Sequence, residues 1–165
     1  TACRWCKGNV PPPRRTFCSA ACVHEHRLRT SGTYVRDCVY KRDKAICWVC
    51  GQDTKKIARE GKKIKNRRKI KSFLKEHNIP TPRKIWKGKW GGGLWDADHV
   101  NPVYSGGGQC GLDNYRTACI PCHREITSAQ ATQRAVTRKK KKESIDETAV
   151  GKITESVQNL DIEDS

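Results

Sequence analysis

The sequence contains no methionine, only two phenylalanines and only 35% hydrophobic residues among its 165 positions. A chain this poor in apolar side chains cannot bury a large core, so we expect one modest domain, with at most a small satellite. No apolar run approaches the roughly 20 residues that a membrane-spanning helix needs, and we expect no membrane partner. No charged-then-apolar leader is present, which favours a reducing cytosol or nucleus. Because the chain begins at Thr1 without a methionine, we expect a fragment or a processed product.

Cysteine, by contrast, is abundant: the chain has ten. Eight of them form four close pairs, which is the spacing of tetrathiolate zinc sites. Two such pairs close a tetrahedron without an open coordination position, so we expect two zinc ions that stabilise the fold and do not catalyse. A redox enzyme is the weaker interpretation, because pairs at matching sites are better explained by zinc. The predicted ligands are Cys3, Cys6, Cys18 and Cys22 for one ion, and Cys47, Cys50, Cys119 and Cys122 for the other.

Positive charge is concentrated in one segment of a chain whose formal net charge is +17. Residues 55–90 carry 15 basic and two acidic side chains, whereas residues 91–137 carry three and four. Such a field attracts a polyanion, and tryptophans between the basic residues suit unpaired or branched nucleic acid. The alternatives are a solvated face or an import signal for the basic run, and core positions for Trp86 and Trp90. The predicted nucleic-acid contacts are Arg67, Arg68, Lys69, Lys71, Lys84, Trp86, Lys87, Lys89, Arg116 and Arg124.

The stretch Leu94–Thr127 contains the residues best suited to catalysis. Two segments separated by a glycine-rich turn, followed by a helical pattern opened by Pro121, predict strand, turn, strand and helix. Asp98 and His99 lie on the first segment, and His123 lies in the first turn of the helix. A regular strand points successive side chains to opposite faces, so Asp98 and His99 can serve one metal only if the strand ends or bulges there.

Hydrolysis of a phosphodiester needs a base that takes a proton from water and a cation that neutralises developing charge. Imidazole titrates near ~6.5 and a carboxyl near ~3.9, so His99 is the predicted base and Asp98 a metal ligand. His123 is the natural second ligand. One carboxylate and one imidazole leave most positions to water and phosphate, which suits Mg²⁺ or Mn²⁺. Asn114 can orient the base, join the metal or pin the hairpin, and the residues alone do not separate these roles.

The order DHVNP, a GG turn, a central Asn and C-x-x-CH resembles the HNH (ββα-metal) nucleases that carry a four-cysteine zinc site around the motif. The longer string LWDADHVNPVYSGGGQCGLDNYRTACIPCHRE resembles more closely the C-terminal HNH domains of zinc-finger annealing helicases, which are structure-specific endonucleases of replication stress. The resemblance implies a small α+β fold with a ββα-metal core, DNA at branched or fork structures as the substrate, and a nuclear location. It also implies a place in a larger helicase-containing polypeptide. Nothing here looks like a Walker motif, so the chain is either an excised domain or a stand-alone relative. The implied roles are base for His99, central motif residue for Asn114, and metal ligand for Asp98 and His123.

We therefore divide the chain into a four-cysteine zinc module over 1–32 and an HNH nuclease domain over 33–135 with a basic insertion over 55–90. The basic-then-acidic tail over 136–165 has few large apolar residues, so we expect little fixed structure there. The rival to a metal-dependent endonuclease is a non-catalytic zinc module that binds nucleic acid or recruits partners with the same basic surface. Both interpretations predict zinc and salt-sensitive binding, and only the first predicts cleavage that His99→Ala abolishes.

Overall fold

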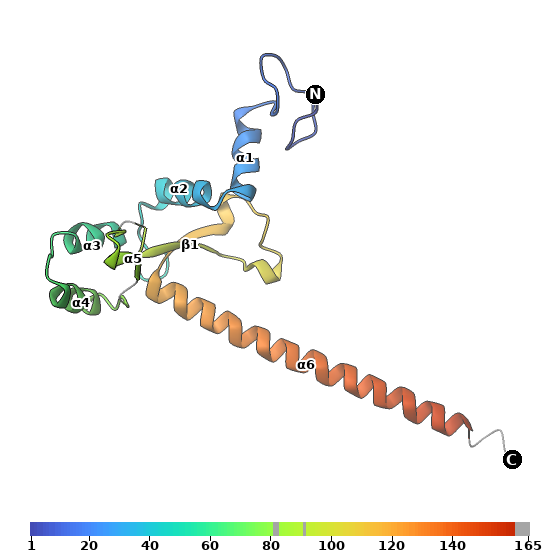
Figure 1. Cartoon of the computed structure of the whole chain (residues 1–165). Coiled ribbons are helices and arrows are strands. Elements are labelled where there is room, and N and C mark those ends of the chain that lie inside the picture. Colours follow the sequence, from blue (N-terminus) through green and yellow to red (C-terminus); the bar gives the residue numbers. More distant parts are fainter. Residues whose placement is uncertain (81–82, 91, 161–165) are drawn as a thin grey trace. The chain divides into compact units, whose positions relative to one another are not determined.

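The computed structural model describes residues 1–80, 83–90 and 92–160, without the side chains of Lys84 and of residues 141–160. It divides into two compact units, Thr1–His123 and Arg124–Ser165 (Figure 1). The first unit combines helices with a two-stranded sheet. This arrangement confirms the small α+β fold that the sequence predicted. Among the described residues, no helix is both long enough and apolar enough to cross a membrane.

The sheet consists of β1 (Trp95–His99) and β2 (Tyr115–Cys119), which pair in antiparallel register from Trp95↔Cys119 to His99↔Tyr115. Two short 3₁₀ turns, η1 (Val103–Ser105) and η2 (Leu112–Asn114), occupy the connection between the strands. Helix α6 begins at Ile120, directly after β2. The predicted order of strand, turn, strand and helix is therefore present. β1 stays paired through His99 and ends there.

Helices α1 (Ala20–Thr30) and α2 (Gly32–Asp43) come first in the chain, where the pattern AACVHEHRLR and the spacing of Val35 and Val39 predict helices. A serine caps each of them: the side chain of Ser19 accepts a hydrogen bond from the backbone N–H of Cys22, and that of Ser31 from the N–H of Tyr34. The apolar side of α2 packs in a core that also receives residues of α1 and of both strands. The buried members of this core are Leu28, Val35, Val39, Ala45, Trp95 and Tyr115.

The basic insertion folds into three short helices, α3 (Thr54–Gly61), α4 (Arg67–Glu76) and α5 (Arg83–Trp86). The helical spacing of Ile70, Phe73 and Leu74 predicts one short amphipathic helix here, ended by Pro80 and Pro82. α4 is that helix, and Pro82 lies outside the described residues. These helices enclose a second core that includes Ile57, Ile70, Leu74, Ile79, Ile85, Trp90 and Leu94. Trp90 is only 6% exposed, and a Cβ added at Gly61 would lie 2.1 Å from its ring. Trp90 is thus a core residue, whereas Trp86 is half-buried and carries the Arg67 guanidinium 4.5 Å from its ring centroid.

In the second unit, α6 continues to Leu160. The sequence predicted little fixed structure over residues 136–165, and the described part of this segment is instead helical; residues 161–165 lie outside the description. The segment has no proline and is rich in lysine and glutamate, so local propensity favours a helix even though few large apolar residues are available for packing.

Candidate metal centres and active site

Four cysteines meet in the N-terminal part of the first unit, where the ligand atoms of Cys3, Cys6, Cys18 and Cys22 all lie within 4.8 Å of one another. The Sγ atoms of Cys18 and Cys22 are 3.3 Å apart. Burial raises the pKa of the Cys3 thiol, but backbone N–H groups of Cys18, Cys6 and Trp5 outweigh burial and lower this pKa to about 6. Donors aimed at a sulfur favour the thiolate, which is the form that binds metal.

The second cluster joins residues far apart in the sequence: Cys47 and Cys50 precede α3, Cys119 ends β2, and Cys122 lies in the first turn of α6. The Sγ atoms of Cys50 and Cys119 are 3.6 Å apart, close to the roughly 3.8 Å expected between sulfurs of a tetrahedral site with ~2.3 Å bonds. The N–H of Cys119 donates to the Cys47 sulfur at 3.3 Å. Burial raises the pKa of the Cys47 thiol, and this backbone donor with those of Cys50 and Val49 lowers it to about 7. Both predicted cysteine sets are thus brought together, and each can hold a structural zinc ion.

Beside the second cluster, Asp98 of β1 faces His123 of α6. Asp98 is paired through Oδ2 with Arg116, whose Nε and Nη2 lie at 3.0 and 2.9 Å. Its other oxygen, Oδ1, lies 3.8 Å from Nε2 of His123. That separation is too long for a hydrogen bond but shorter than two metal–ligand bonds of roughly 2.1 Å laid end to end. The two predicted ligands are therefore placed where one divalent cation fits between them.

Asp96 is a third member of this group, and it was not among the predicted residues. Its Oδ2 lies 3.5 Å from Nδ1 of His123, and its Oδ1 accepts a hydrogen bond from Arg36 at 3.2 Å. A carboxylate on one ring nitrogen leaves the other nitrogen, Nε2, directed at Asp98. The signal was present in the sequence, because residues i and i+2 of a strand share one face and Asp96 precedes Asp98 by two positions.

His99 lies on the other face of β1, together with Trp95. Its ring centroid is 4.5 Å from that of Tyr115, the residue opposite it in the ladder. Its Nε2 is buried and has no hydrogen-bond partner in the described part of the chain. The condition for Asp98 and His99 to serve one metal, a strand that ends or bulges between them, is not met, because the pairing remains regular through His99. The structure thus brings Asp98 and His123 together and does not place the imidazole of His99 with them.

Asn114 uses its side chain to hold the loop that follows β1. Its Oδ1 accepts a hydrogen bond from the N–H of Asn101 at 2.7 Å, and its Nδ2 donates to the carbonyls of Asn101 and Gly107. The backbone is tight here, since a Cβ at Gly107 would lie 1.9 Å from the Asn101 carbonyl oxygen. Of the three roles considered for Asn114, this geometry supports pinning the hairpin.

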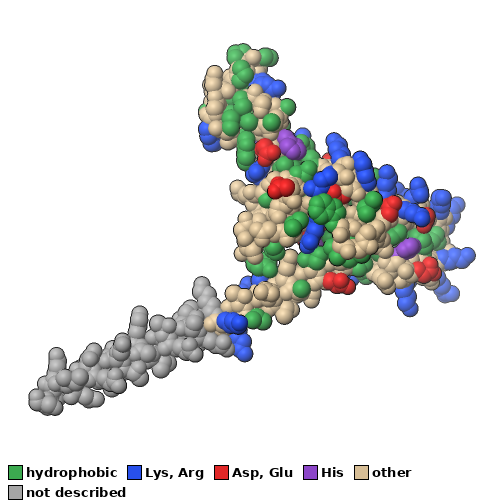
Figure 2. Space-filling model, turned by 180° about the vertical axis from the view of Figure 1, so that it is seen from behind, with side chains coloured by type: hydrophobic (Ala, Val, Ile, Leu, Met, Phe, Trp, Pro, Cys, Tyr) green, Lys and Arg blue, Asp and Glu red, His purple; other side chains and the backbone are tan. Residues whose placement is uncertain are grey.

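The basic residues predicted to contact nucleic acid are distributed over several elements. Lysine and arginine side chains gather over the helices of the insertion (Figure 2). Arg116 differs from these residues, because it is bonded to Asp98 at the candidate active site. Arg124 is an exposed residue of the second unit, and the side chain of Lys84 lies outside the described part. The exposed predicted contacts in the insertion are Arg67, Arg68, Lys69, Lys71, Lys87 and Lys89.

An antiparallel strand pair followed at once by a helix, with acidic side chains of the first strand facing the first turn of that helix, is the ββα arrangement of HNH domains. No protein-family model matches the chain. It is similar to the proteins named DNA annealing helicase and endonuclease ZRANB3, at 33% identity over 128 residues to that of Mus musculus and 30% over 138 residues to that of Homo sapiens. These alignments cover 74% and 81% of this chain but only 12% and 13% of the relatives' length.

The crystal structure of the human ZRANB3 HNH domain is similar in fold, with a TM-score of 0.52 and 27% identity over 68% of this chain and 98% of that domain. The first unit therefore contains an HNH domain. It is an HNH domain like that of ZRANB3.

Proposed function

We propose that this chain is a metal-dependent endonuclease domain that hydrolyses DNA phosphodiester bonds. The observation that carries the proposal is the pairing of Asp98 with His123 beside a four-cysteine cluster, in a domain similar to the HNH domain of a protein named as an endonuclease. An acidic and an imidazole ligand on one face of a ββα unit suit a divalent cation that keeps positions open for substrate.

In this proposal Asp98 and His123 hold Mg²⁺ or Mn²⁺, which when bound neutralises charge on the phosphate and on the leaving oxygen. Asp96 positions the His123 ring through its carboxylate, 3.5 Å from Nδ1, so that Nε2 remains directed at Asp98. Arg116 anchors the second oxygen of Asp98 and adds a fixed positive charge where an anionic phosphate would enter. These two contacts orient the ligand pair before substrate arrives.

His99 acts as the base that takes a proton from the attacking water. Support comes from its place as the last paired residue of β1, next to the proposed ligand Asp98, and from Nε2, which makes no hydrogen bond to the described residues. Because His99 and Asp98 point to opposite faces, the scissile phosphate must lie across the end of the strand to contact both. Asn114 holds the backbone immediately after that end and acts as a positioning residue.

The relatives are described as annealing helicases as well as endonucleases, and this chain covers about an eighth of their length. We therefore propose that the domain acts within a larger helicase-containing polypeptide in the nucleus, on branched or fork DNA. The concentration of positive charge in the insertion supports DNA as the substrate. Its exposed lysines and arginines provide a surface for a polyanion in the same unit as Asp98 and His123.

A nicking assay tests the proposal, using supercoiled plasmid and a panel of labelled duplex, single-stranded, flap and fork DNA with Mg²⁺ or Mn²⁺. His99→Ala and Asp98→Ala should each reduce cleavage by at least about a hundredfold while DNA binding is retained. Asp96→Asn should lower activity about tenfold to a hundredfold, an effect that more metal partly reverses. Asp113→Ala, an exposed acid of η2, is the control for loss of a carboxylate. A zinc-loaded wild-type chain that nicks none of these substrates would favour the non-catalytic nucleic-acid-binding module.

A further inference from the structure

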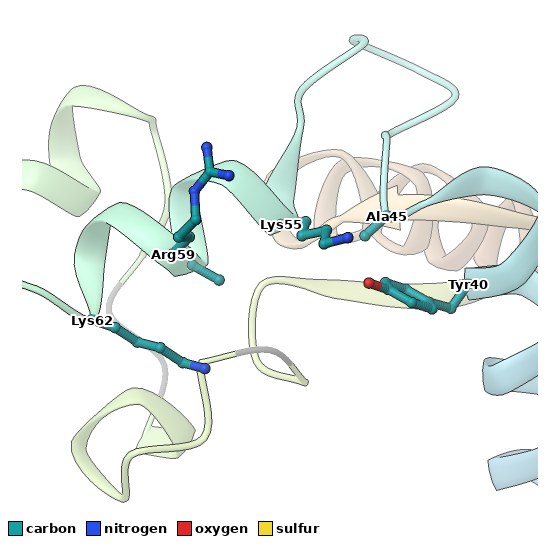
Figure 3. A pocket seen from close by; sticks show the side chains of 6 residues that line it. Tyr40, Ala45, Lys55, Arg59 and Lys62 are labelled. Atoms are coloured by element: carbon teal, nitrogen blue, oxygen red, sulfur yellow. The ribbon is translucent and has the colours of Figure 1, made fainter.

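A pocket of about 420 Å³ lies between α2 and α3, away from the residues assigned to cleavage (Figure 3). Its volume falls within the roughly 300–1,000 Å³ of typical small-ligand sites. One wall comes from α3 and the residue after it, and the other from α2 and the segment that follows. The lining residues are Tyr40, Ala45, Lys55, Ala58, Arg59 and Lys62.

The α3 wall is strongly basic. Lys55, Arg59 and Lys62 recur at the spacing i, i+4 and i+7, which places them along one side of the helix. All three are exposed, and no ion pair joins any of them to a carboxylate within the described ranges. Like charges four residues apart on a helix repel each other, so an anion in the pocket would relieve a repulsion that no carboxylate of the described residues relieves.

The opposite wall presents an aromatic ring. Tyr40 is 37% exposed, and it stacks on the buried Trp95 with ring centroids 6.3 Å apart and an angle of 22° between the planes. Its hydroxyl and the Lys62 ammonium point into the space from opposite sides (Figure 3). The ammonium of Lys55 lies 5.8 Å from the Tyr40 ring centroid. Because Trp95 already supports the Tyr40 ring, binding of a ligand to this aromatic surface would cost little further side-chain freedom.

We propose that this pocket binds one unpaired nucleotide of the DNA, with the base against Tyr40 and the phosphate at Lys55, Arg59 and Lys62. An unpaired base offers a free face for stacking, whereas within a duplex the base faces are covered by neighbouring base pairs and only the phosphates and the base edges in the grooves are accessible. The proposal rests on DNA as the substrate and deepens it, because flaps, forks and single-stranded tails supply such a nucleotide. Both the pocket and the proposed cleavage site adjoin β1, whose first residue, Trp95, supports Tyr40 and whose other face carries Asp98.

Fluorescence anisotropy with a short labelled oligothymidine and a blunt duplex of equal length tests this proposal. No divalent cation is added, so that the result does not depend on cleavage. Tyr40→Leu keeps an apolar cover on Trp95 but removes the aromatic face, and it should weaken single-strand binding about tenfold and duplex binding less than about twofold. Tyr40→Phe should bind as the wild type does. Zinc content and thermal unfolding confirm that each variant is folded.

Charge-matched double variants provide the second arm. Lys55→Gln with Lys62→Gln should weaken oligothymidine binding more than Lys56→Gln with Lys63→Gln, which removes the same charge from residues outside the pocket. The proposal is overturned if the two double variants weaken single-strand binding equally, or if Tyr40→Leu affects duplex and single strand alike. Either result would make the pocket part of a general phosphate-binding surface. If the binding results are as expected but the wild-type chain nicks no DNA, the result would instead count against the nuclease proposal alone.

Discussion

Replacing Asp43 by alanine removes the carboxylate that joins α2 to β2. This side chain is 3% exposed and accepts hydrogen bonds from the N–H and the hydroxyl of Thr117, at 3.0 and 2.9 Å, and from Arg42 at 2.6 and 3.0 Å. Thr117 is fully buried, and its partner in β1 is Ala97, which lies between the two aspartates of the proposed site. Asp43 therefore fixes the catalytic hairpin against the helix.

The expected loss follows from the groups left behind. The N–H and hydroxyl of Thr117 would be buried without partners, whereas Arg42 is 31% exposed and can be hydrated. An unsatisfied buried donor costs about 1–3 kcal/mol. With two such donors on Thr117, we expect the free energy of unfolding to fall by about 2–4 kcal/mol. For a unit of this size that corresponds to a fall in Tm of roughly 10 °C, measured by circular dichroism on zinc-loaded protein. Nicking activity should fall with it at temperatures near the new Tm.

The pH dependence of the same contribution has a definite sign. Burial raises the pKa of Asp43, but the hydrogen bonds from Arg42 and Thr117 outweigh burial and hold the pKa below its usual value. The stabilisation is therefore present above the unfolded pKa near ~3.9 and is lost as the pH falls through the folded pKa. The stability difference between wild type and Asp43→Ala should be constant from neutral pH down to about 5 and should narrow below about 4. Asp37→Ala, an exposed acid on the same helix, is the control, and equal stability of the two variants would refute the reasoning.

The remaining predictions concern zinc binding by the cysteine clusters and the loop that follows β1. Cys47→Ser should reduce bound zinc from two ions per chain to one and lower the Tm, whereas Cys38→Ser, outside both clusters, should retain both ions, as measured by elemental analysis after dialysis. Gly107→Ala should displace the Asn101 carbonyl, cost about 1–3 kcal/mol and lower nicking, because the loop after His99 moves. Gly108→Ala meets only a Val103 side chain at 3.3 Å and should be nearly neutral in both assays. Equal effects of the two glycine variants would contradict the role given to this loop.

The two cysteine clusters differ in what they hold in place. The N-terminal set closes within 20 residues of chain and supports the segment before α1, whereas the second connects the start of α3 with the end of β2 and the start of α6. His123 directly follows Cys122, so the second cluster anchors the turn of helix that carries a proposed catalytic ligand. Loss of zinc at Cys47 should therefore affect activity as well as stability.

The spacing of residues along the chain was enough to predict which short segments bind zinc and which form strands, turns and helices. Cysteine pairs separated by two or three residues predicted both clusters, because a knuckle is a local turn that places two sulfurs on one ion. The order of strand, turn, strand and helix was predicted for the same reason: alternation, glycine-rich turns and a proline at a helix start act over a few residues. Local propensity also explains the difference over the tail. Little fixed structure was predicted because the segment has few large apolar residues, but its helix-forming residues favour a helix without them.

Tertiary packing decided which of these segments meet and which faces they present. The sequence predicted Asp98, His99 and His123 as one site, but only the tertiary structure shows that His123, in the first turn of α6, lies near Asp98 and Asp96 while His99 lies against Tyr115. The bond from Asp43 to Thr117, which spans 74 positions, likewise has no local signature. Such contacts depend on how helices and strands pack across the whole unit, because burial and hydrogen-bond satisfaction are decided by neighbours that are remote along the chain.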